Sequence, residues 1–405
     1  MEEEKFNLEN ISNIIRNILT LRYDPTQKTS LPILNSQDFN PSNQLDLNYV
    51  ENILQNSIRT KLSNEQNLTI SLSGGIDSTL VLGLIRKTFP NMKINAMSIK
   101  FAHSVDETNT AKKIADFFEA EHKTISLENY LLELPAAISV IGLPFWDIHW
   151  YYIAKNAKEK SKFLASGDGG DELFGGYVFR YSKFLSLIRP NSTPLDKIQA
   201  YLSCHERDWI PNQEGIFNPK TNFSWSSIHS TFQHYFDNSL SSLNQVFLAD
   251  YNGKLLYNFS IIGNRINEFF NLKPITPILE PELISYSSHL PPESKYDSQT
   301  NLGKLPLRKL LSKYHCDSLI SKEKLGFSVN TTNLWNLIGK ELCELYLDDA
   351  RIVQDGWINK EWISSNIKRS DLDIRHVNKF LGLLALEIWY RLFVTKEINS
   401  NCKLS

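Results

Sequence analysis

A glycine-rich turn between a short strand and a helix is the feature that most constrains the fold of this chain. Residues 68–72 form a short apolar run typical of a strand, and the sequence Ser-Gly-Gly-Ile-Asp-Ser follows at residues 73–78. Helical periodicity then covers residues 78–87. The strand therefore leads through a tight turn directly into a helix, which is how units of an α/β fold begin.

The alternation of strand and helix continues through the first half of the chain. Further strands are expected at the ranges 93–101, 122–127 and 162–165, and helices at 50–62, 107–120, 129–141 and 149–158, with Pro135 interrupting the third helix. This order predicts an α/β fold, a parallel twisted sheet with helices on both faces. After residue 176 the patterns are mostly helical, without strong strand signals.

We expect one main domain over residues 48–398, divided into an α/β half (48–176) and a mainly helical half (177–398). Residues 1–47 are polar and contain one short helical pattern near residues 11–21. Because Pro25, Pro32 and Pro41 follow it, we expect this segment to be an arm or a loosely packed extension.

Charge and cysteine content exclude several classes of protein. The 405 residues include 43 Lys and Arg against 45 Asp and Glu, so the net charge of −2 gives no overall attraction to nucleic acid or to an anionic membrane. The four cysteines are far apart in the sequence, which argues against a zinc site and a secreted disulfide framework.

Localisation signals are also missing from the sequence pattern. The N-terminus is acidic and polar, unlike a signal peptide. The longest apolar stretch, residues 380–394, contains Glu387 and Arg391, so we expect a buried helix rather than a membrane span. The expected location is the cytoplasm.

The first glycine-rich motif has the chemistry of a phosphate site. Gly74 and Gly75 lack a Cβ, so backbone N–H groups can approach phosphate oxygens, and the following helix adds its positive N-terminal end. Ser73 and Ser78 add hydroxyl donors, whereas Asp77 would repel phosphate unless Mg²⁺ lay between them. The segment has no Gly-Lys-Ser/Thr and is not a Walker A loop. The structural alternative is an ordinary serine-capped turn.

A second motif, residues 166–177, also follows a short strand. It holds five glycines and three carboxylates in twelve residues, a composition that suits neither a strand nor a helix interior. We therefore expect a loop at the carboxyl end of a strand, where parallel sheets bind ligands. The structural alternative is a solvated acidic loop.

Together the two motifs resemble the synthetase domain of the asparagine synthetase family, which belongs to the N-type ATP pyrophosphatases with an adenine nucleotide alpha-hydrolase-like fold. The resemblance runs over residues 50–395. Three further segments are similar to family motifs: Lys-Glu-Lys-Leu-Gly-Phe at 322–327 followed by Trp335, Pro-Ile-Leu-Glu at 277–280, and Leu-Glu-Ile-Trp-Tyr-Arg at 386–391.

The resemblance implies a reaction in which ATP adenylates a carboxylate, pyrophosphate leaves, and an amine attacks the acyl-adenylate to give an amide and AMP. It implies that the loop Ser73, Gly74, Gly75, Asp77 and Ser78 holds pyrophosphate, that Asp77 and Asp171 bind Mg²⁺, and that adenosine contacts Ser71, Ile99, Ser166 and Gly167. Lys324 would offset charge on the departing pyrophosphate. Asp168 would orient or deprotonate the amine. Glu172 would either line the substrate pocket or cap the next helix.

The expected substrate region departs from the family pattern. Where asparagine synthetases carry threonine and arginine for aspartate, residues 144–152 are aromatic and contain no arginine. Trp146, Asp147 and His149, with Glu172, are the candidates for a substrate pocket. The alternative is a core of aromatic side chains around a hydrogen-bonded histidine. Asn330 replaces a family proline, and Ile275 and Thr276 replace the arginine before Pro277.

We therefore expect an ATP- and Mg²⁺-dependent ligase that joins a small-molecule or peptide carboxylate to ammonia or an amine. The second residue is Glu2 rather than the cysteine of the family's glutaminase domain, so nitrogen is expected from free ammonia, an amine or a separate glutaminase. One alternative closes an amide within one substrate, as β-lactam synthetases and peptide macrocyclases do. Another is an inactive nucleotide-binding scaffold.

Overall fold

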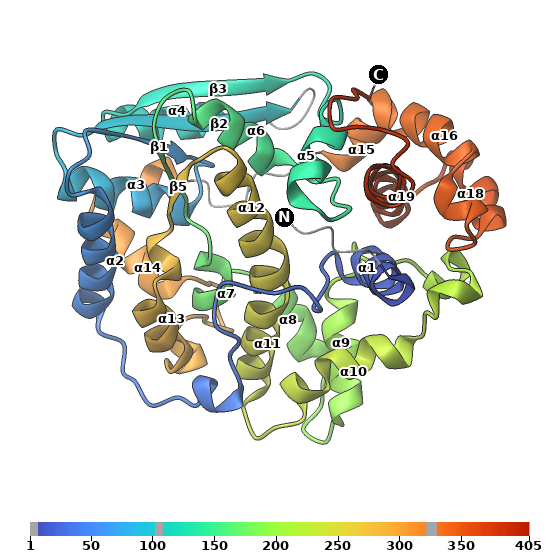
Figure 1. Ribbon diagram of the computed structural model, residues 1–405. Coiled ribbons are helices and arrows are strands. Elements are labelled where there is room, and N and C mark those ends of the chain that lie inside the picture. The colour runs from blue at the N-terminus through green and yellow to red at the C-terminus, as the bar shows by residue number, and fades with distance from the viewer. Residues whose placement is uncertain (1–6, 102–107, 321–329, 405) are drawn as a thin grey trace.

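The computed structural model describes residues 7–101, 108–320 and 330–404. Within these residues, five parallel strands form one sheet. The strand order is β3-β2-β1-β4-β5 (Figure 1). The strands are β1 (Asn67–Ser71), β2 (Lys93–Phe101), β3 (Glu121–Leu127), β4 (Phe163–Ala165) and β5 (Lys273–Ile275). The α/β class predicted from the sequence is confirmed.

The burial of each strand follows its place in the sheet. The central strands β1 and β4 are almost wholly buried, whereas β3 at one edge alternates between exposed and partly covered residues. The strand β5 lies at the other edge, where Pro274 is tolerated because one side needs no hydrogen-bond donor. The strand β5 was not predicted from the sequence, which has no strong strand signals after residue 176, because three residues with a central proline give too short a pattern.

The helices that link the strands cover both faces of the sheet. The helices α3 (Ile76–Thr88) and α4 (Thr108–Phe117) connect β1, β2 and β3, and α5 (Leu134–Ile141) and α6 (His149–Ala157) lead back to β4. The chain crosses the sheet in the opposite direction on this return, and parallel crossovers are right-handed, so the two pairs lie on opposite faces. Pro135 stands in the first turn of α5 and starts that helix instead of interrupting it.

The second half of the chain is mainly helical, as predicted (Figure 1). The remaining α-helices and π-helical segments are α2 (Leu47–Leu62), α7 (Gly170–Phe174), α8 (Val178–Leu187), α9 (Pro194–Ser203), α10 (Trp225–Phe236), α11 (Ser242–Asp250), η4 (Tyr251–Ser260), α12 (Ile261–Phe269), α13 (Pro281–Ser288), α14 (Leu305–Ser312), α15 (Thr331–Leu334), η8 (Trp335–Gly339), α16 (Lys340–Asp348), α17 (Arg351–Gln354), α18 (Lys360–Ile367) and α19 (Ile374–Phe393).

The helix α19 is the hub of the C-terminal helices and contacts α5, α15, α16, α17 and the N-terminal helix α1 (Leu8–Leu21). Its buried Glu387 accepts hydrogen bonds from Arg391 and from the backbone N–H groups of Arg351 and Ile352, so it also caps α17. Glu387 and Arg391, the two charged residues of the apolar stretch 380–394, thus form an ion pair within α19. Among the described residues, no helix combines the length and apolar character that a bilayer crossing requires.

The N-terminal segment is packed more tightly than the sequence suggests. The helix α1 (Leu8–Leu21) buries Ile11, Ile14, Ile15 and Ile18, and it contacts α19. Lys379 of α19 donates a hydrogen bond to the carbonyl of Leu19. The expectation of a loosely packed arm is corrected for this helix, because its apolar stripe has a partner that lies more than 300 residues later in the sequence.

Candidate active site

The two glycine-rich motifs meet at the centre of the sheet. The strands β1 and β4 are neighbours, with Ile70 paired to Ala165, and the first motif follows β1 while the second follows β4. The chain runs outward from β1 through β2 to β3 and then returns to the other side of β1. The carboxyl ends of these two strands therefore form the topological switch point where open α/β sheets bind ligands.

The first motif presents donors at the N-terminus of α3. Gly74 adopts a left-handed conformation with φ of +76°, and Gly75 precedes the helix without a side-chain cap on its N–H groups. The Ser73 and Ser78 hydroxyl oxygens are 3.2 Å apart, and the Gly75 N–H donates to the Ser73 Oγ at 3.3 Å. Uncapped N–H groups, a helix dipole and two hydroxyls together form an anion-binding turn.

The second motif packs directly against the first because Gly167 has no side chain. A Cβ at this position would lie 2.6 Å from the backbone nitrogen of Ser78 and 2.7 Å from the carbonyl carbon of Asp77. Gly170 leaves room in the same way for the Asp77 carboxylate, and Gly176 leaves room for Asp171 and Lys304. These three glycines explain the unusual composition of the motif.

Part of the second motif is helical, contrary to the expectation of a loop. Residues Gly170–Phe174 form the single-turn helix α7, which starts and ends next to the left-handed residues Gly169 and Gly175. Asp171 and Glu172 occupy its first turn, where a helix favours negative charge. The glycines therefore end a short helix rather than keep the segment irregular.

Asp77 and Asp171, predicted to bind Mg²⁺, are brought together around Lys304. The Lys304 Nζ forms an ion pair with Asp77 and lies 2.9 Å from Asp171 Oδ1. Lys304 itself is almost buried, so desolvation lowers its pKa, but the two carboxylates outweigh this effect and raise it above the ordinary value. The side chain is therefore a fixed positive charge.

Lys304 was not among the residues predicted from the sequence. It lies 227 residues after Asp77, and its left-handed backbone, with φ of +57°, places it just before α14. Nothing local in the sequence marks this residue, since its partners are distant. The sequence held one indirect indication of such a residue: two carboxylates that lie close together need a positive charge nearby.

The donor set suits Mg²⁺ held jointly by protein and substrate. Within the described ranges no group of three or more His, Cys, Asp or Glu residues is placed to hold a metal on its own. Mg²⁺ is commonly bound through one or two carboxylates together with substrate phosphates and water. Asp77 and Asp171, beside the anion-binding turn, match that pattern.

The expected adenosine contacts lie on the same edge of the sheet. Ser71 ends β1 opposite Met97, and Ile99 lies two residues further along β2 on the same face as Met97. Ser166 follows β4 and its N–H donates to the Ile275 carbonyl. Ser71, Ile99 and Ser166 are all buried in the protein on its own.

Asp168 lies between the end of β4 and the start of α7, at the same edge of the sheet. Its carboxylate accepts a hydrogen bond of 2.7 Å from the Ser166 hydroxyl, and the residue is exposed to water although protein surrounds it on most sides. Partial desolvation raises the pKa of Asp168, while the Ser166 hydrogen bond and the charge of His149 oppose the change. The carboxyl is thus accessible to a substrate and more basic than a freely hydrated aspartate.

Glu172 is buried and does not cap the next helix. Its carboxyl accepts a 2.5 Å hydrogen bond from the Tyr177 hydroxyl, and α8 has no side-chain cap. Burial and the neighbouring Asp171 charge raise the pKa of Glu172 to about 7. The capping role considered from the sequence is corrected: the side chain points into the protein behind the metal-site candidates.

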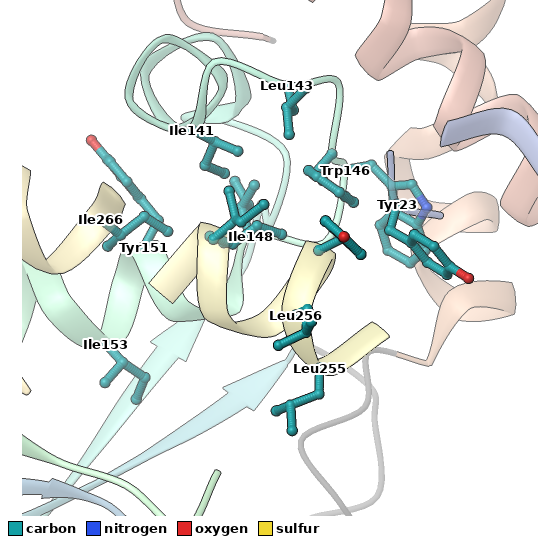
Figure 2. Packing of buried hydrophobic residues seen from close by; sticks show 14 of the residues in the cluster. Tyr23, Ile141, Leu143, Trp146, Ile148, Tyr151, Ile153, Leu255, Leu256 and Ile266 are labelled. Atoms are coloured by element: carbon teal, nitrogen blue, oxygen red, sulfur yellow. The ribbon is translucent and has the colours of Figure 1, made fainter. Parts of the chain in front are cut away.

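The aromatic stretch contains a charged pair. Asp147 Oδ1 lies 2.9 Å from His149 Nδ1 and accepts a 2.7 Å hydrogen bond from Tyr130. Burial lowers the pKa of His149, but the charges of Asp147 and Asp168 outweigh it and raise the pKa overall. Trp146 is buried, together with Ile148 and Tyr23 (Figure 2). The stretch is therefore partly aromatic core and partly a hydrogen-bonded Asp-His pair.

Of three further segments noted in the sequence, one lies outside the described residues and two have structural roles. Lys324, with the surrounding Lys-x-Gly-Phe segment, falls in the range 321–329, which the structure does not describe. Pro277–Leu279 form a short 3₁₀ turn (η5), and Leu279 packs against Gly169 of the second motif. Asn330 caps α15 by accepting a hydrogen bond from the Asn333 N–H.

Most of the chain matches a known protein family. A family model described as asparagine synthase matches residues 49–391. The asparagine synthetase (glutamine-hydrolyzing) 1 of Bacillus subtilis is 24% identical over 346 residues, covering 75% of this chain and 54% of that protein. A putative asparagine synthetase of Mycobacterium tuberculosis is also 24% identical, covering 76% of this chain and 51% of that protein. The chain thus spans about half the length of these curated relatives.

Solved structures give more distant similarities. NMN synthetase from Francisella tularensis is 15% identical, with a TM-score of 0.25 and coverage of 51% of this chain and 95% of that one. An NH₃-dependent NAD synthetase from Campylobacter jejuni is 16% identical, with a TM-score of 0.27 and coverage of 49% and 99%.

Proposed function

Because this chain belongs to the asparagine synthase family, we propose that it is an ATP- and Mg²⁺-dependent ligase that joins a carboxylate to ammonia or an amine. The carboxylate oxygen attacks the α-phosphorus of ATP, and the bond to pyrophosphate breaks. The amine nitrogen then attacks the acyl-adenylate, AMP leaves, and a base takes the proton from nitrogen. The products are an amide, AMP and pyrophosphate.

One observation supports this proposal most strongly: the meeting of the two motifs at the ends of β1 and β4. The N–H groups at the start of α3 and the hydroxyls of Ser73 and Ser78 are positioned for pyrophosphate oxygens. Lys304, fixed between two carboxylates, adds a permanent positive charge. Stabilising the charge of the leaving group is the main task of a protein in phosphoryl and nucleotidyl transfer.

Asp77 and Asp171 would hold Mg²⁺, which when bound would neutralise charge on the phosphates. Lys304 holds the two carboxylates together and would lie near the pyrophosphate during the reaction. We assign Lys324 a similar stabilising role on the basis of its sequence motif. The adenosine would lie against the edge formed by Ser71, Ile99, Ser166 and Gly167.

Asp168 is the group that we assign to the amine. Asp168 is exposed, is oriented by Ser166, and has a raised pKa, so it can accept a hydrogen bond and then a proton from the attacking nitrogen. His149 lies close enough for its charge to act on Asp168. Trp146, Asp147 and His149 would form one wall of the carboxylate pocket, whereas Glu172 would support it from behind.

An assay of products tests this function. The purified chain is incubated with ATP, Mg²⁺, L-aspartate and ammonium, and nucleotides, pyrophosphate and asparagine are quantified. Equal amounts of AMP, pyrophosphate and asparagine are the expected result. Formation of ADP and phosphate would contradict the proposal, and so would a failure to cleave ATP with any carboxylate.

A second candidate is a synthetase that closes an amide within one substrate. The aromatic stretch around Trp146 and the absence of arginine from residues 144–152 favour a substrate other than aspartate. In that case the assay with a peptide or amino-acid derivative that carries both groups gives AMP and pyrophosphate without added ammonium. A dependence on ammonium with every active acid would exclude it.

A further inference from the structure

The Pro-Ile-Leu-Glu segment at residues 277–280 has no part in the proposed reaction, yet it packs directly against the second glycine-rich motif. A Cβ at Gly169 would overlap Cδ2 of Leu279 and would lie 3.1 Å from its Cγ. The backbone of Gly169 has a φ of +91°, a conformation that few other residues tolerate. Leu279 therefore fills the space that a side chain at residue 169 would take.

Gly169 joins the two functional parts of the second motif. It follows Asp168, and it is the N-cap of α7, where its carbonyl accepts a 3.0 Å hydrogen bond from the Leu173 N–H. The helix α7 is also held by contacts with α11, α13, α14 and η4. Asp168 is instead exposed, and its carboxylate bonds to the Ser166 hydroxyl. A displacement of Gly169 should thus move Asp168 more than it moves the carboxylates of α7.

Leu279 is fixed by the turn that carries it. Pro277 restricts the backbone at the start of η5, and the Leu279 N–H donates a 3.0 Å hydrogen bond to the Thr276 carbonyl. The neighbouring Ile278 is fully buried, so one face of the turn is anchored in the core. The Leu279 side chain therefore has little freedom to leave Gly169.

Glu280 ties this turn to α2. Its carboxylate accepts a 2.7 Å hydrogen bond from the Ser57 hydroxyl and forms an ion pair with Lys61. Both partners belong to α2, which packs against α3, the helix that begins at the anion-binding turn. Glu280 thus connects the contact at Gly169 with the helix of the first motif.

We propose that Leu279 is a positioning residue: it holds Gly169 so that Asp168 faces the attacking amine, and Glu280 anchors it to α2. The inference rests on the proposed ligase function, from which the role of Asp168 comes. Leu279 acts through the backbone of the second motif and need not touch the substrate. Its loss should slow the amide step, which uses Asp168, more than the adenylation step, which uses the phosphate-binding turn.

Two rates measured on one variant separate these steps. Exchange of labelled pyrophosphate into ATP, with the active acid and no ammonium, reports adenylation, and amide formation at saturating ammonium reports the complete reaction. We expect Leu279→Ala to lower kcat for the amide about tenfold or more and the exchange less than about threefold. Leu279→Met, of similar volume, should restore amide formation. The control is Leu372→Ala, a partly buried leucine before α19, which should keep both rates.

Further variants test the anchor and keep the experiment decisive. Leu279→Val removes one methylene group and should show a smaller effect in the same direction if Leu279→Ala is unstable. Glu280→Ala should also slow amide formation, but Leu279→Ala/Glu280→Ala should lose no more than Leu279→Ala alone, because Glu280 acts through Leu279. An equal fall in exchange and amide formation would overturn the proposal, as would normal amide formation by Leu279→Ala.

Hydrogen exchange tests the contact without catalysis. The Leu173 N–H is bonded to the Gly169 carbonyl, so Leu279→Ala should accelerate its exchange about tenfold or more, whereas Leu372→Ala should not. Accelerated exchange in a protein whose wild type cleaves no ATP in the product assay would support the contact and contradict the ligase. An active ligase in which Leu279→Ala leaves the Leu173 exchange unchanged would support the ligase and overturn the positioning role.

Discussion

At the scale of single residues, the site depends on positions where a side chain is absent as much as on those where one is present. Gly167, Gly170 and Gly176 allow the second motif to contact Asp77, Asp171 and Lys304. The candidate Mg²⁺ ligands could be predicted from the sequence because their motifs are local. Lys304 could not, since its ion pairs join segments that are far apart in the sequence.

Replacing Asp77 by Asn tests the proposed metal role. The change retains the shape of the side chain but removes the charge that would bind Mg²⁺ and that pairs with Lys304. We expect pyrophosphate release to fall by about 10²–10³-fold, the usual loss for a fixed electrostatic contact in an active site. The matched control is Asp116→Asn, an exposed aspartate that pairs with Lys112 on α4 and should keep its activity. Normal turnover of Asp77→Asn would refute the assignment.

Adding one methyl group at Gly167 tests the contact between the motifs. In Gly167→Ala the new Cβ overlaps the backbone of α3, so the loops must move apart. We expect a loss of about 1–3 kcal/mol in the free energy of unfolding, together with a loss of activity. Gly215→Ala is the control, because its Cβ would meet only Trp362 at 3.7 Å. Denaturant titration measures the loss of stability, and the pyrophosphate assay measures the loss of activity. Equal stability and activity of the two variants would exclude the close contact between the two motifs.

At the scale of elements, the sequence predicted the central strands and the helices around them, because local apolar patterns determine both. It did not predict β5, whose three residues include a proline, or the single turn of α7 between glycines. It also did not predict that α1 would be packed, since the stripe on a helix does not reveal its distant partner. Elements whose stability comes from tertiary contacts were thus missed or misjudged.

Because α1 is packed into the core, truncating one of its buried side chains should strongly lower the stability of the protein. Ile15 is fully buried in the core, so Ile15→Ala should destabilise the protein by about 2–5 kcal/mol. Leu8, at the start of the same helix, is 66% exposed, and Leu8→Ala should change stability by less than about 0.5 kcal/mol. Thermal and denaturant unfolding compare the two. An equally small effect of Ile15→Ala would restore the view of a loosely packed arm.

We expect the free energy of unfolding to depend on pH because of Glu172, a buried carboxyl on the short helix α7. Its pKa is raised from 4.5 in the unfolded chain to about 7 in the fold, so the folded state binds the proton more strongly. The stabilising effect of that proton is complete below about pH 4.5 and is lost as the pH rises to about 7. Relative to Glu172→Gln, wild-type stability should therefore fall across this window, by at most roughly 1.4 kcal/mol per pH unit. A difference that is constant with pH would contradict the buried, protonatable state.

At the scale of the whole molecule, the folded unit is larger than the family match. The five-stranded sheet lies within residues 49–391, which the family model matches, whereas α1 precedes them. The helix α1 nevertheless packs against α19, near the C-terminal end of the match. The proposed ATP chemistry therefore belongs to the sheet, and α1 completes the fold around it.

The fate of the carboxylate oxygen tests the central claim most directly. The chain is incubated with ATP, Mg²⁺, ammonium and the active acid labelled with ¹⁸O in its carboxyl group, with L-aspartate tried first, and the nucleotide products are analysed by mass spectrometry. If the two motifs form a site for carboxylate adenylation, AMP gains one ¹⁸O atom and pyrophosphate gains none. Unlabelled AMP, or ADP with phosphate as the products, would contradict the account.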